Sequence, residues 1–138
     1  MSIEDKIAIY EVIAKYSYTY DGKNADGFAE LFTEDAVWES RRQGNAVPYT
    51  HLESQKTIRD YVTERLEGRL ATTFTRHFQT GTLFEELTLN TARSRTMVMI
   101  THQTPEDEAP RVVLSGEYQD EWRKTEQGWK FARRTLLR

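Results

Sequence analysis

The chain of 138 residues carries 19 Lys and Arg against 22 Asp and Glu, for a net charge of −3, and has no cysteine. This length suffices for one domain, residues 1–138, because a second core needs roughly another 100 residues. Without cysteine the chain can form no disulfide, thiolate zinc site, iron–sulfur cluster or cysteine nucleophile. The mild acidity argues against a nucleic-acid partner, whose phosphates call for clustered Lys and Arg on one face.

The first residues lack the basic region and apolar run of an export signal. No apolar run approaches the roughly 18 residues of a membrane span. We therefore expect a cytoplasmic protein without a membrane partner.

The N-terminal half predicts three helices. Ser2 with Asp5 is typical of a helix N-cap, and apolar residues then recur at helical spacing over 3–20, until Gly22. A short helix fits 25–32, a strand begins at Ala36, and the polar segment 40–47 indicates a loop. Ser54 caps a third helix that ends before Gly68. Its recurring positions, at spacings of three and four, are Ile58, Tyr61, Val62, Arg65 and Leu66.

After Gly68 the hydrophobic period changes to two, which predicts strands over 73–84, 91–102, 111–125 and 129–137. Glu126-Gln127-Gly128 is typical of a short hairpin connection between the last two. Three helices followed by antiparallel strands predict an α+β fold, with the helices packed on one face of a curved sheet.

Alternation along these strands places two histidines on faces that are otherwise mostly apolar. His77 shares a face with Gln79, Gly81 and Leu83, and His102 shares a face with Ala92, Val98 and Ile100. If both faces are concave, an apolar hollow receives both imidazoles.

The chain has no phosphate-binding glycine loop, no Gly-x-Ser-x-Gly elbow and no His-x-x-x-His pair. The histidines are not at ligand spacing, so we expect neither a metal nor a cofactor. The remaining candidates for general acid–base chemistry are Asp21, His77 and His102, together with Tyr16 and Tyr20. Each also has an ordinary explanation: Asp21 as a turn residue, the histidines as strand residues and the tyrosines as core lining. We assign His51 no role.

Several stretches of sequence resemble a known family over nearly the whole chain. They are IYEVIAKY at 9–16, YDGK at 20–23, FAELFTEDAVW at 28–38, GEYQDEW at 116–122 and GWKF at 128–131. The chain resembles the SnoaL-like proteins of the nuclear transport factor 2-like superfamily. The resemblance implies a cone-shaped α+β barrel, in which three N-terminal helices pack on a strongly curved antiparallel sheet that encloses a pocket.

The scytalone-dehydratase-like branch is the most similar in its polar residues, and Tyr20-Asp21, His77 and His102 match its acid–base positions. That branch has a further tyrosine near the first strand, where this chain has Trp38, so Tyr49 or a first-helix tyrosine would substitute. Tyr16 resembles the placement in bile-acid dehydratases of the superfamily. The other residues that the resemblance suggests for substrate binding are Trp38, Val98, Ile100 and Ser115, the last a loose match.

These features lead to the hypothesis of a cofactor-independent lyase or isomerase, dehydratase-like, acting on a small, largely apolar, oxygenated molecule. Asp21 orients His77 as general base, while His102 and a tyrosine polarise the substrate. The alternative is a homodimeric module of the same fold that binds small molecules without chemistry, because this fold hosts both. An epoxide hydrolase would need an Asp-Arg-Asp set, of which only Asp21 has an obvious place.

Met97 and Met99 alternate away from Val98 and Ile100, which leaves an apolar strip on the outer face of the sheet. A monomer would expose this strip. We therefore expect a homodimer assembled through that face.

Overall fold

The computed structural model describes residues 2–138. Within this range no helix has the length and apolar character needed to cross a membrane. The elements follow in the order α1 (Ile3–Asp21), α2 (Ala25–Ala29), β1 (Phe32–Arg41), β2 (Thr50–Glu53), α3 (Gln55–Glu67), β3 (Phe74–Leu87), β4 (Thr91–Gln103), β5 (Arg111–Thr125) and β6 (Gly128–Leu137).

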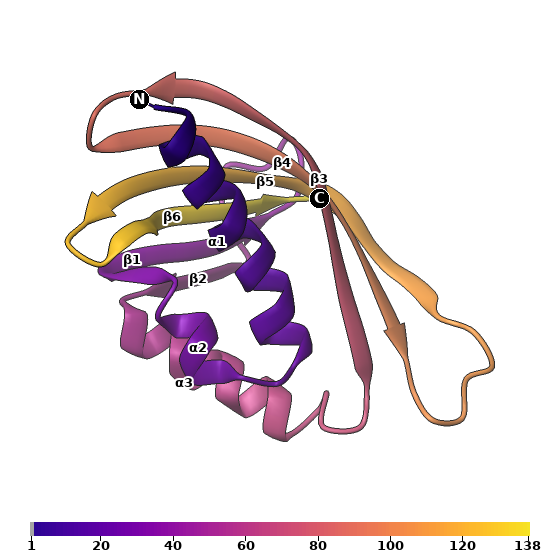
Figure 1. Cartoon of the computed structure of the whole chain (residues 1–138). Coiled ribbons are helices and arrows are strands. Elements are labelled where there is room, and N and C mark those ends of the chain that lie inside the picture. The colour runs from indigo at the N-terminus through magenta and orange to yellow at the C-terminus, as the bar shows by residue number, and fades with distance from the viewer. Residues whose placement is uncertain (1) are drawn as a thin grey trace.

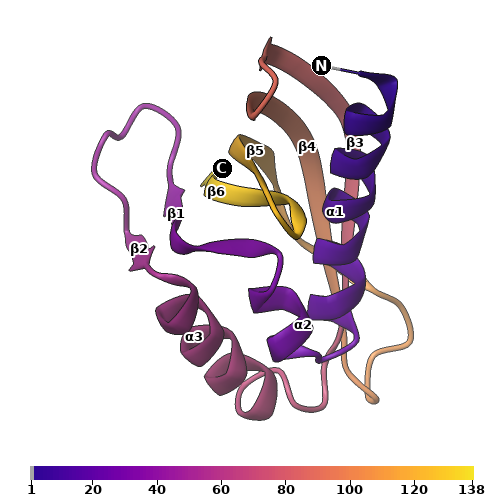
Figure 2. The same ribbon diagram turned by 60° about the vertical axis from the view of Figure 1, so that its left-hand side comes forward.

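The strands form one curled sheet in the order β2-β1-β6-β5-β4-β3. All neighbouring pairs are antiparallel except β1 and β6, which are parallel. The three helices lie on the same side of this sheet, with α1 along β3 and α3 beside β1 and β2 (Figures 1 and 2). The predicted α+β fold, with helices on a curved, mostly antiparallel sheet, is confirmed.

Helix α1 begins with the capping box that the sequence predicts. The Asp5 amide donates to Ser2 Oγ at 3.2 Å, and the Ser2 amide donates to Asp5 Oδ2 at 3.1 Å. The other carboxylate oxygen, Oδ1, accepts bonds from Trp129 Nε1 at 2.9 Å and Lys124 Nζ at 3.0 Å. One carboxylate therefore caps α1 and also fastens it to the β5–β6 hairpin, and these bonds hold the pKa of Asp5 well below its usual range.

The element boundaries around β1 differ from the expectation, and β3 runs on to Leu87 rather than ending at residue 84. Helix α2 ends at Ala29 rather than residue 32, and β1 begins at Phe32 rather than Ala36 and runs on to Arg41. Phe32 is fully buried and pairs with Phe131 of β6, so sheet packing overrides a spacing that also fits a helix. Strand β2 was not predicted, because four residues are too few for a period of two to be distinctive.

A bulge in β3 changes the face assigned to one residue. The pairing of β3 with β4 shifts register between Thr80 and Leu83, around Gly81, whose φ is +71°. Leu83 consequently faces outward and is 54% exposed, whereas His77 and Gln79 keep the concave face. The expectation that Leu83 shares the face of His77 was therefore wrong.

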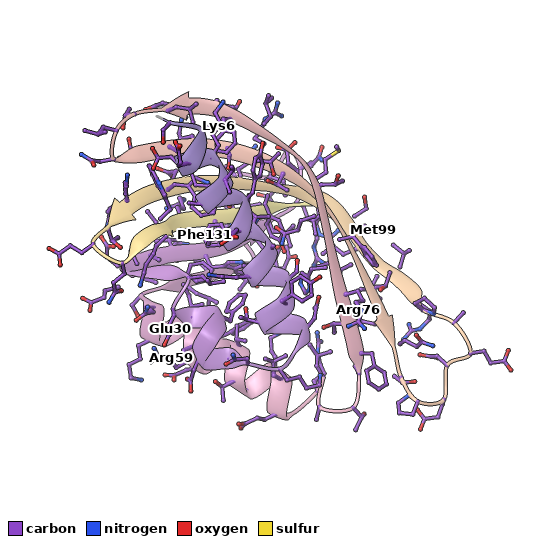
Figure 3. All side chains as sticks on the ribbon, in the orientation of Figure 1. Lys6, Glu30, Arg59, Arg76, Met99 and Phe131 are labelled. Atoms are coloured by element: carbon purple, nitrogen blue, oxygen red, sulfur yellow. The ribbon has the colours of Figure 1, made fainter. Side chains whose placement is uncertain are left out.

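The core lies between the concave face of the sheet and the helices, and it is mainly aromatic. Its largest buried side chains include Trp122, Tyr118, Phe28 and Phe131. Figure 3 shows Phe131 on β6 beneath α1, whereas Met99 lies on the stretch of β4 that extends beyond the helices. Aromatic side chains thus fill much of the space between the curved sheet and the helices.

The outer face of β1 carries a buried carboxylate surrounded by cations. Glu39 is 1% exposed, and its Oε1 accepts bonds from Arg41 Nη2 and Arg133 Nη2, each at 2.6 Å. Its Oε2 lies 3.0 Å from His51 Nδ1, and His51 Nε2 lies 2.9 Å from Glu53. Although burial raises the pKa of Glu39, the bonds from Arg133, His51 and Arg41 outweigh it and lower this pKa to about 2. His51 therefore ties β2 to β1, a structural role that the sequence did not suggest.

Glu39→Gln is expected to remove a pH-dependent part of the stability. Because the pKa of Glu39 is lowered on folding, its stabilisation is complete above its ordinary pKa of 4.5 and is lost as the pH falls towards 2. We expect a loss on the order of 3 kcal/mol in the free energy of unfolding at pH 7, and a smaller difference from wild type at pH 3. Urea unfolding at both pH values measures this, with the exposed Glu126→Gln as control. An equal difference at both pH values would contradict it.

Candidate active site

A cavity of about 330 Å³ lies between the concave face of the sheet and the helices. Residues from all three helices and all six strands line it. Residues proposed from the sequence that line it are Tyr16, Tyr20, Trp38, Tyr49, His77 and Ile100.

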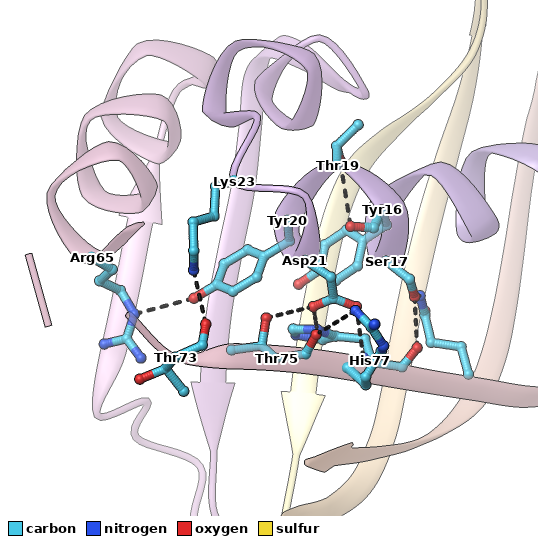
Figure 4. Close-up of polar contacts among 12 residues, drawn as sticks. Tyr16, Ser17, Thr19, Tyr20, Asp21, Lys23, Arg65, Thr73, Thr75 and His77 are labelled. Atoms are coloured by element: carbon cyan, nitrogen blue, oxygen red, sulfur yellow. Dashed lines mark hydrogen bonds and ion pairs between the residues drawn. The ribbon is translucent and has the colours of Figure 1, made fainter. Parts of the chain in front are cut away.

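Asp21, the last residue of α1, accepts three hydrogen bonds from β3 (Figure 4). Its Oδ1 accepts from Thr75 Oγ1 and lies 2.7 Å from His77 Nδ1, while its Oδ2 accepts from the His77 amide at 2.9 Å. The side chains of Asp21 and His77 are 9% and 6% exposed. Asp21 therefore contacts His77 from the side away from the cavity and does not itself line the cavity.

This contact determines which ring nitrogen of His77 is available. A carboxylate only accepts hydrogen bonds, so Nδ1 carries the proton that is shared with Asp21. Within residues 2–138, Nε2 has no protein hydrogen-bond partner, and the ring forms part of the cavity wall. Nε2 therefore has a free lone pair, which is the arrangement that a general base requires.

Two tyrosines of α1 flank the His77 ring. The ring centroids of Tyr20 and Tyr16 lie 4.9 Å and 5.9 Å from that of His77, both in edge-on geometry. Tyr16, Tyr20 and Asp21 occupy neighbouring turns at the end of one helix, so the helical spacing places all three beside one strand. The imidazole and the two phenols thus come from two elements that are held together by Asp21.

The hydroxyl of Tyr16 accepts two hydrogen bonds, from Trp38 Nε1 at 3.1 Å and from the hydroxyl of Tyr118 at 3.3 Å. The Tyr16 hydroxyl can therefore still donate its own proton in a further hydrogen bond. Burial raises the pKa of Tyr16, and the nearby Arg134 guanidinium only partly opposes this. Tyr16 therefore keeps its proton at neutral pH and can act as a hydrogen-bond donor at the cavity wall.

His102 lies on β4, opposite Thr75 in the register, and so on the same face as the Asp21–His77 pair. It is partly buried but does not line the cavity. Burial lowers its pKa, and the proximity of His77 and of three arginines lowers it further. His102 is therefore neutral at pH 7, beside the site rather than in it.

Of the residues proposed for substrate binding, Tyr49, Val98 and Ser115 differ in their position relative to the cavity. Tyr49 lines the cavity, and its hydroxyl accepts a bond from Ser40 Oγ at 2.6 Å. Val98 is a buried core residue that does not line the cavity. Ser115 pairs with Met99 on the outer face and is exposed, so it lies away from the cavity.

The structure adds residues that the motif search did not select. Arg65 and Tyr61 line the cavity from α3, and Arg65 Nε donates to the Tyr20 hydroxyl at 3.4 Å. Their signal was present in the sequence, because Arg65 falls among the apolar positions of that helix. Thr75 had a weaker signal, since it precedes His77 by two residues in a strand and so shares its face.

A fully buried arginine supports the same wall from the sheet. Arg134 on β6 pairs with Asp120, Nε to Oδ1 at 2.8 Å, and its guanidinium lies 3.5 Å from the centroid of the Tyr118 ring and 4.2 Å from that of Tyr16. Its Nη2 donates to Gln79 at 2.7 Å. Burial raises the pKa of Asp120 to about 6, against the opposing effect of Arg134. Arg134 thus holds the rings of Tyr16 and Tyr118 in place.

Within residues 2–138 no group of three or more His, Asp or Glu side chains is arranged to hold a metal ion. The polar groups that line the cavity are the His77 imidazole, tyrosine hydroxyls, the hydroxyls of Ser40 and Thr50, and arginines. These groups can abstract a proton, donate hydrogen bonds and bind an anion.

The chain resembles several solved structures of the same fold. A candidate aromatic-ring hydroxylase from Novosphingobium aromaticivorans is 27% identical, with a TM-score of 0.81 over 99% of this chain and 90% of the other. A nuclear transport factor 2-like protein with a cystatin-like fold from the same organism has a TM-score of 0.83 at 20% identity, covering 98% and 82%. A candidate scytalone dehydratase, also from that organism, has a TM-score of 0.79 at 22% identity, covering 97% and 83%.

A search of curated proteins finds no significant match to the chain. The family model of the SnoaL-like domain, however, matches residues 1–135, which is nearly the entire chain. Together with the curled sheet, the three helices and the enclosed cavity, this match shows that the chain belongs to the SnoaL-like domain family.

Proposed function

We propose that the protein is a cofactor-independent lyase or isomerase that acts by general acid–base catalysis on a small, largely apolar, oxygenated molecule such as a cyclic ketone or a polyketide-like phenol. The observation that carries this proposal is the hydrogen-bonded Asp21–His77 pair, which leaves Nε2 of His77 without a protein partner among residues 2–138 while His77 lines a partly closed cavity. A pocket that only binds an apolar ligand does not need an imidazole that is held in one tautomer.

In this mechanism His77 Nε2 removes a proton from carbon next to a carbonyl of the substrate. Asp21 stabilises the imidazolium that forms, because its carboxylate already accepts the Nδ1 proton. The hydroxyl of Tyr16, or that of Tyr20, donates to the carbonyl oxygen as negative charge develops there. His77 then returns the proton to a leaving hydroxyl, which completes a dehydration, or to another carbon, which completes an isomerisation.

Two similarities to known proteins support this class of reaction: the family match and one structural neighbour. The SnoaL-like match gives the fold and the cavity, and one structural neighbour is named as a candidate scytalone dehydratase. In this mechanism His102 does not contact the substrate, because it does not line the cavity.

The tautomer of His77 can be measured without a substrate. In wild type we expect the Nδ1–H tautomer, and in Asp21→Asn a shift toward Nε2–H, because an amide can donate to Nδ1 where a carboxylate cannot. Nitrogen-15 NMR of histidine-labelled protein distinguishes the two forms, with His77→Gln to assign the signals. Asp60→Asn, an exposed aspartate on α3, serves as the control. An unchanged His77 spectrum in Asp21→Asn would contradict the orienting role.

Turnover tests the reaction. On a substrate found by screening oxygenated cyclic compounds, Asp21→Asn and His77→Gln should each lose roughly 10²- to 10⁴-fold in kcat while their thermal melts show a folded protein. The double variant should lose little more than either single one, because the two residues act as a unit. His102→Gln should have a milder effect. Near-normal turnover in Asp21→Asn would remove this mechanism, and a fully active His77→Gln would favour a binding module.

We further propose that the protein forms a homodimer through the outer face of its sheet. Met97, Met99 and Phe78 lie side by side there and are 55%, 41% and 50% exposed. Such an exposed apolar strip is unfavourable in water.

Sedimentation at micromolar concentration is therefore expected to give a dimer. Met97→Glu, which places a charge opposite Glu117 in the register, should give a monomer that still melts cooperatively as a folded protein, at a lower temperature than wild type. Leu89→Glu is the matched control, because Leu89 is 72% exposed in the β3–β4 turn, away from the strip. A wild-type protein that sediments only as a 16.2 kDa species would contradict the dimer.

A further inference from the structure

The charged side chains that line the cavity are all of one sign. Three arginines, Arg65, Arg69 and Arg138, form part of its wall, and among the residues that the structure describes no Asp or Glu lines it. This is unusual for a chain with a net charge of −3, in which acidic residues are the more numerous. A partly closed hollow whose only charges are positive favours an anion over a neutral or cationic ligand.

Of these three arginines, Arg65 has the most hydrogen-bond contacts with other residues of the cavity wall. It is half-buried on α3, and its guanidinium lies between two phenols, with Nε 3.4 Å from the Tyr20 hydroxyl and Nη1 3.4 Å from the Tyr61 hydroxyl. Within residues 2–138 no carboxylate oxygen lies within 4.0 Å of it, whereas Arg59 on the same helix pairs with Asp26. Two long bonds to neutral oxygens leave most of its five N–H donors unused.

We propose that the ligand of this cavity is a carboxylic acid with an apolar body, and that Arg65 binds its carboxylate. This inference rests on the proposed function, whose substrate class it narrows. A planar guanidinium matches a carboxylate with two parallel hydrogen bonds. The surrounding wall, which includes Phe28, Ile58 and Leu114, suits an aromatic or alicyclic body.

The position of Arg65 also sets where the carboxylate lies relative to the reacting carbon. Tyr20 separates the two functional groups, because its hydroxyl contacts Arg65 and its ring packs edge-on against His77 at 4.9 Å (Figure 4). A substrate held by both groups therefore carries its carboxylate about one ring away from the carbon that His77 deprotonates. This excludes simple α-keto acids and favours ring-containing acids with the oxygenated carbon on the far side.

Paired probes of equal shape test the proposal by binding alone. We compare 2-naphthoate with 2-naphthamide, and benzoate and cinnamate with their amides, by calorimetry on the full chain. Wild type should bind the acids roughly 10- to 100-fold more tightly than the amides. Arg65→Gln should abolish this preference while affinity for the amides changes little, and Arg65→Lys should retain part of it. Arg59→Gln, on the same helix and paired with Asp26, should leave the preference intact.

Equal affinity for acid and amide in wild type would overturn the proposal, as would a preference that survives in Arg65→Gln. Failure of every carboxylate to bind up to millimolar concentration would also overturn it. Asp21→Asn and His77→Gln should keep the preference, so binding is read separately from turnover. A preference for acids in a protein whose turnover does not depend on His77 would support the carboxylate site and contradict the acid–base mechanism.

Discussion

The carboxylate of Asp21 joins the end of α1 to β3 through three hydrogen bonds, two of which go to His77 itself. These bonds bind the backbone as well as the ring of His77, so they fix both the position of the strand and the orientation of the imidazole. They also satisfy a carboxylate that is almost fully buried and would otherwise be costly to desolvate. One set of hydrogen bonds therefore holds α1 on β3 and also serves the role that we propose for Asp21.

The curled sheet separates two kinds of polar chemistry by its two faces. On the concave face, Arg134 and the aromatic rings it contacts form a rigid wall behind Tyr16, so the hydroxyl of Tyr16 has little freedom to move. On the outer face, Glu39 is neutralised by arginines and by His51. Alternation along β1 places Trp38 in the cavity and Glu39 outside it, so neighbouring residues serve opposite faces.

The cavity has two functional ends that come from different elements. His77 belongs to β3 and is held by α1, whereas Arg65 belongs to α3, and Tyr20 of α1 contacts both. A proton acceptor and a fixed positive charge at opposite sides of one phenol ring orient a small molecule without a metal or a cofactor in the proposed mechanism. Such preorganised groups stabilise developing charge without further rearrangement.

Local pattern was enough to predict the helices, the long strands and the α+β class, because a capping box and a period of 3.6 or 2 are short-range properties of the chain. The pairing of Asp21 with His77 joins residues 56 positions apart, and its prediction came from the family resemblance rather than from local pattern. Local pattern could not place β2, the outward turn of Leu83 or the position of His102 beside the cavity, since these depend on a bulge, a register and partners distant in sequence. Arg65 illustrates what local sequence pattern cannot predict. Its helical spacing put it among apolar residues, but that it faces a cavity free of Asp and Glu follows from how α3 packs against α1 and the curled sheet, and no single segment encodes that packing.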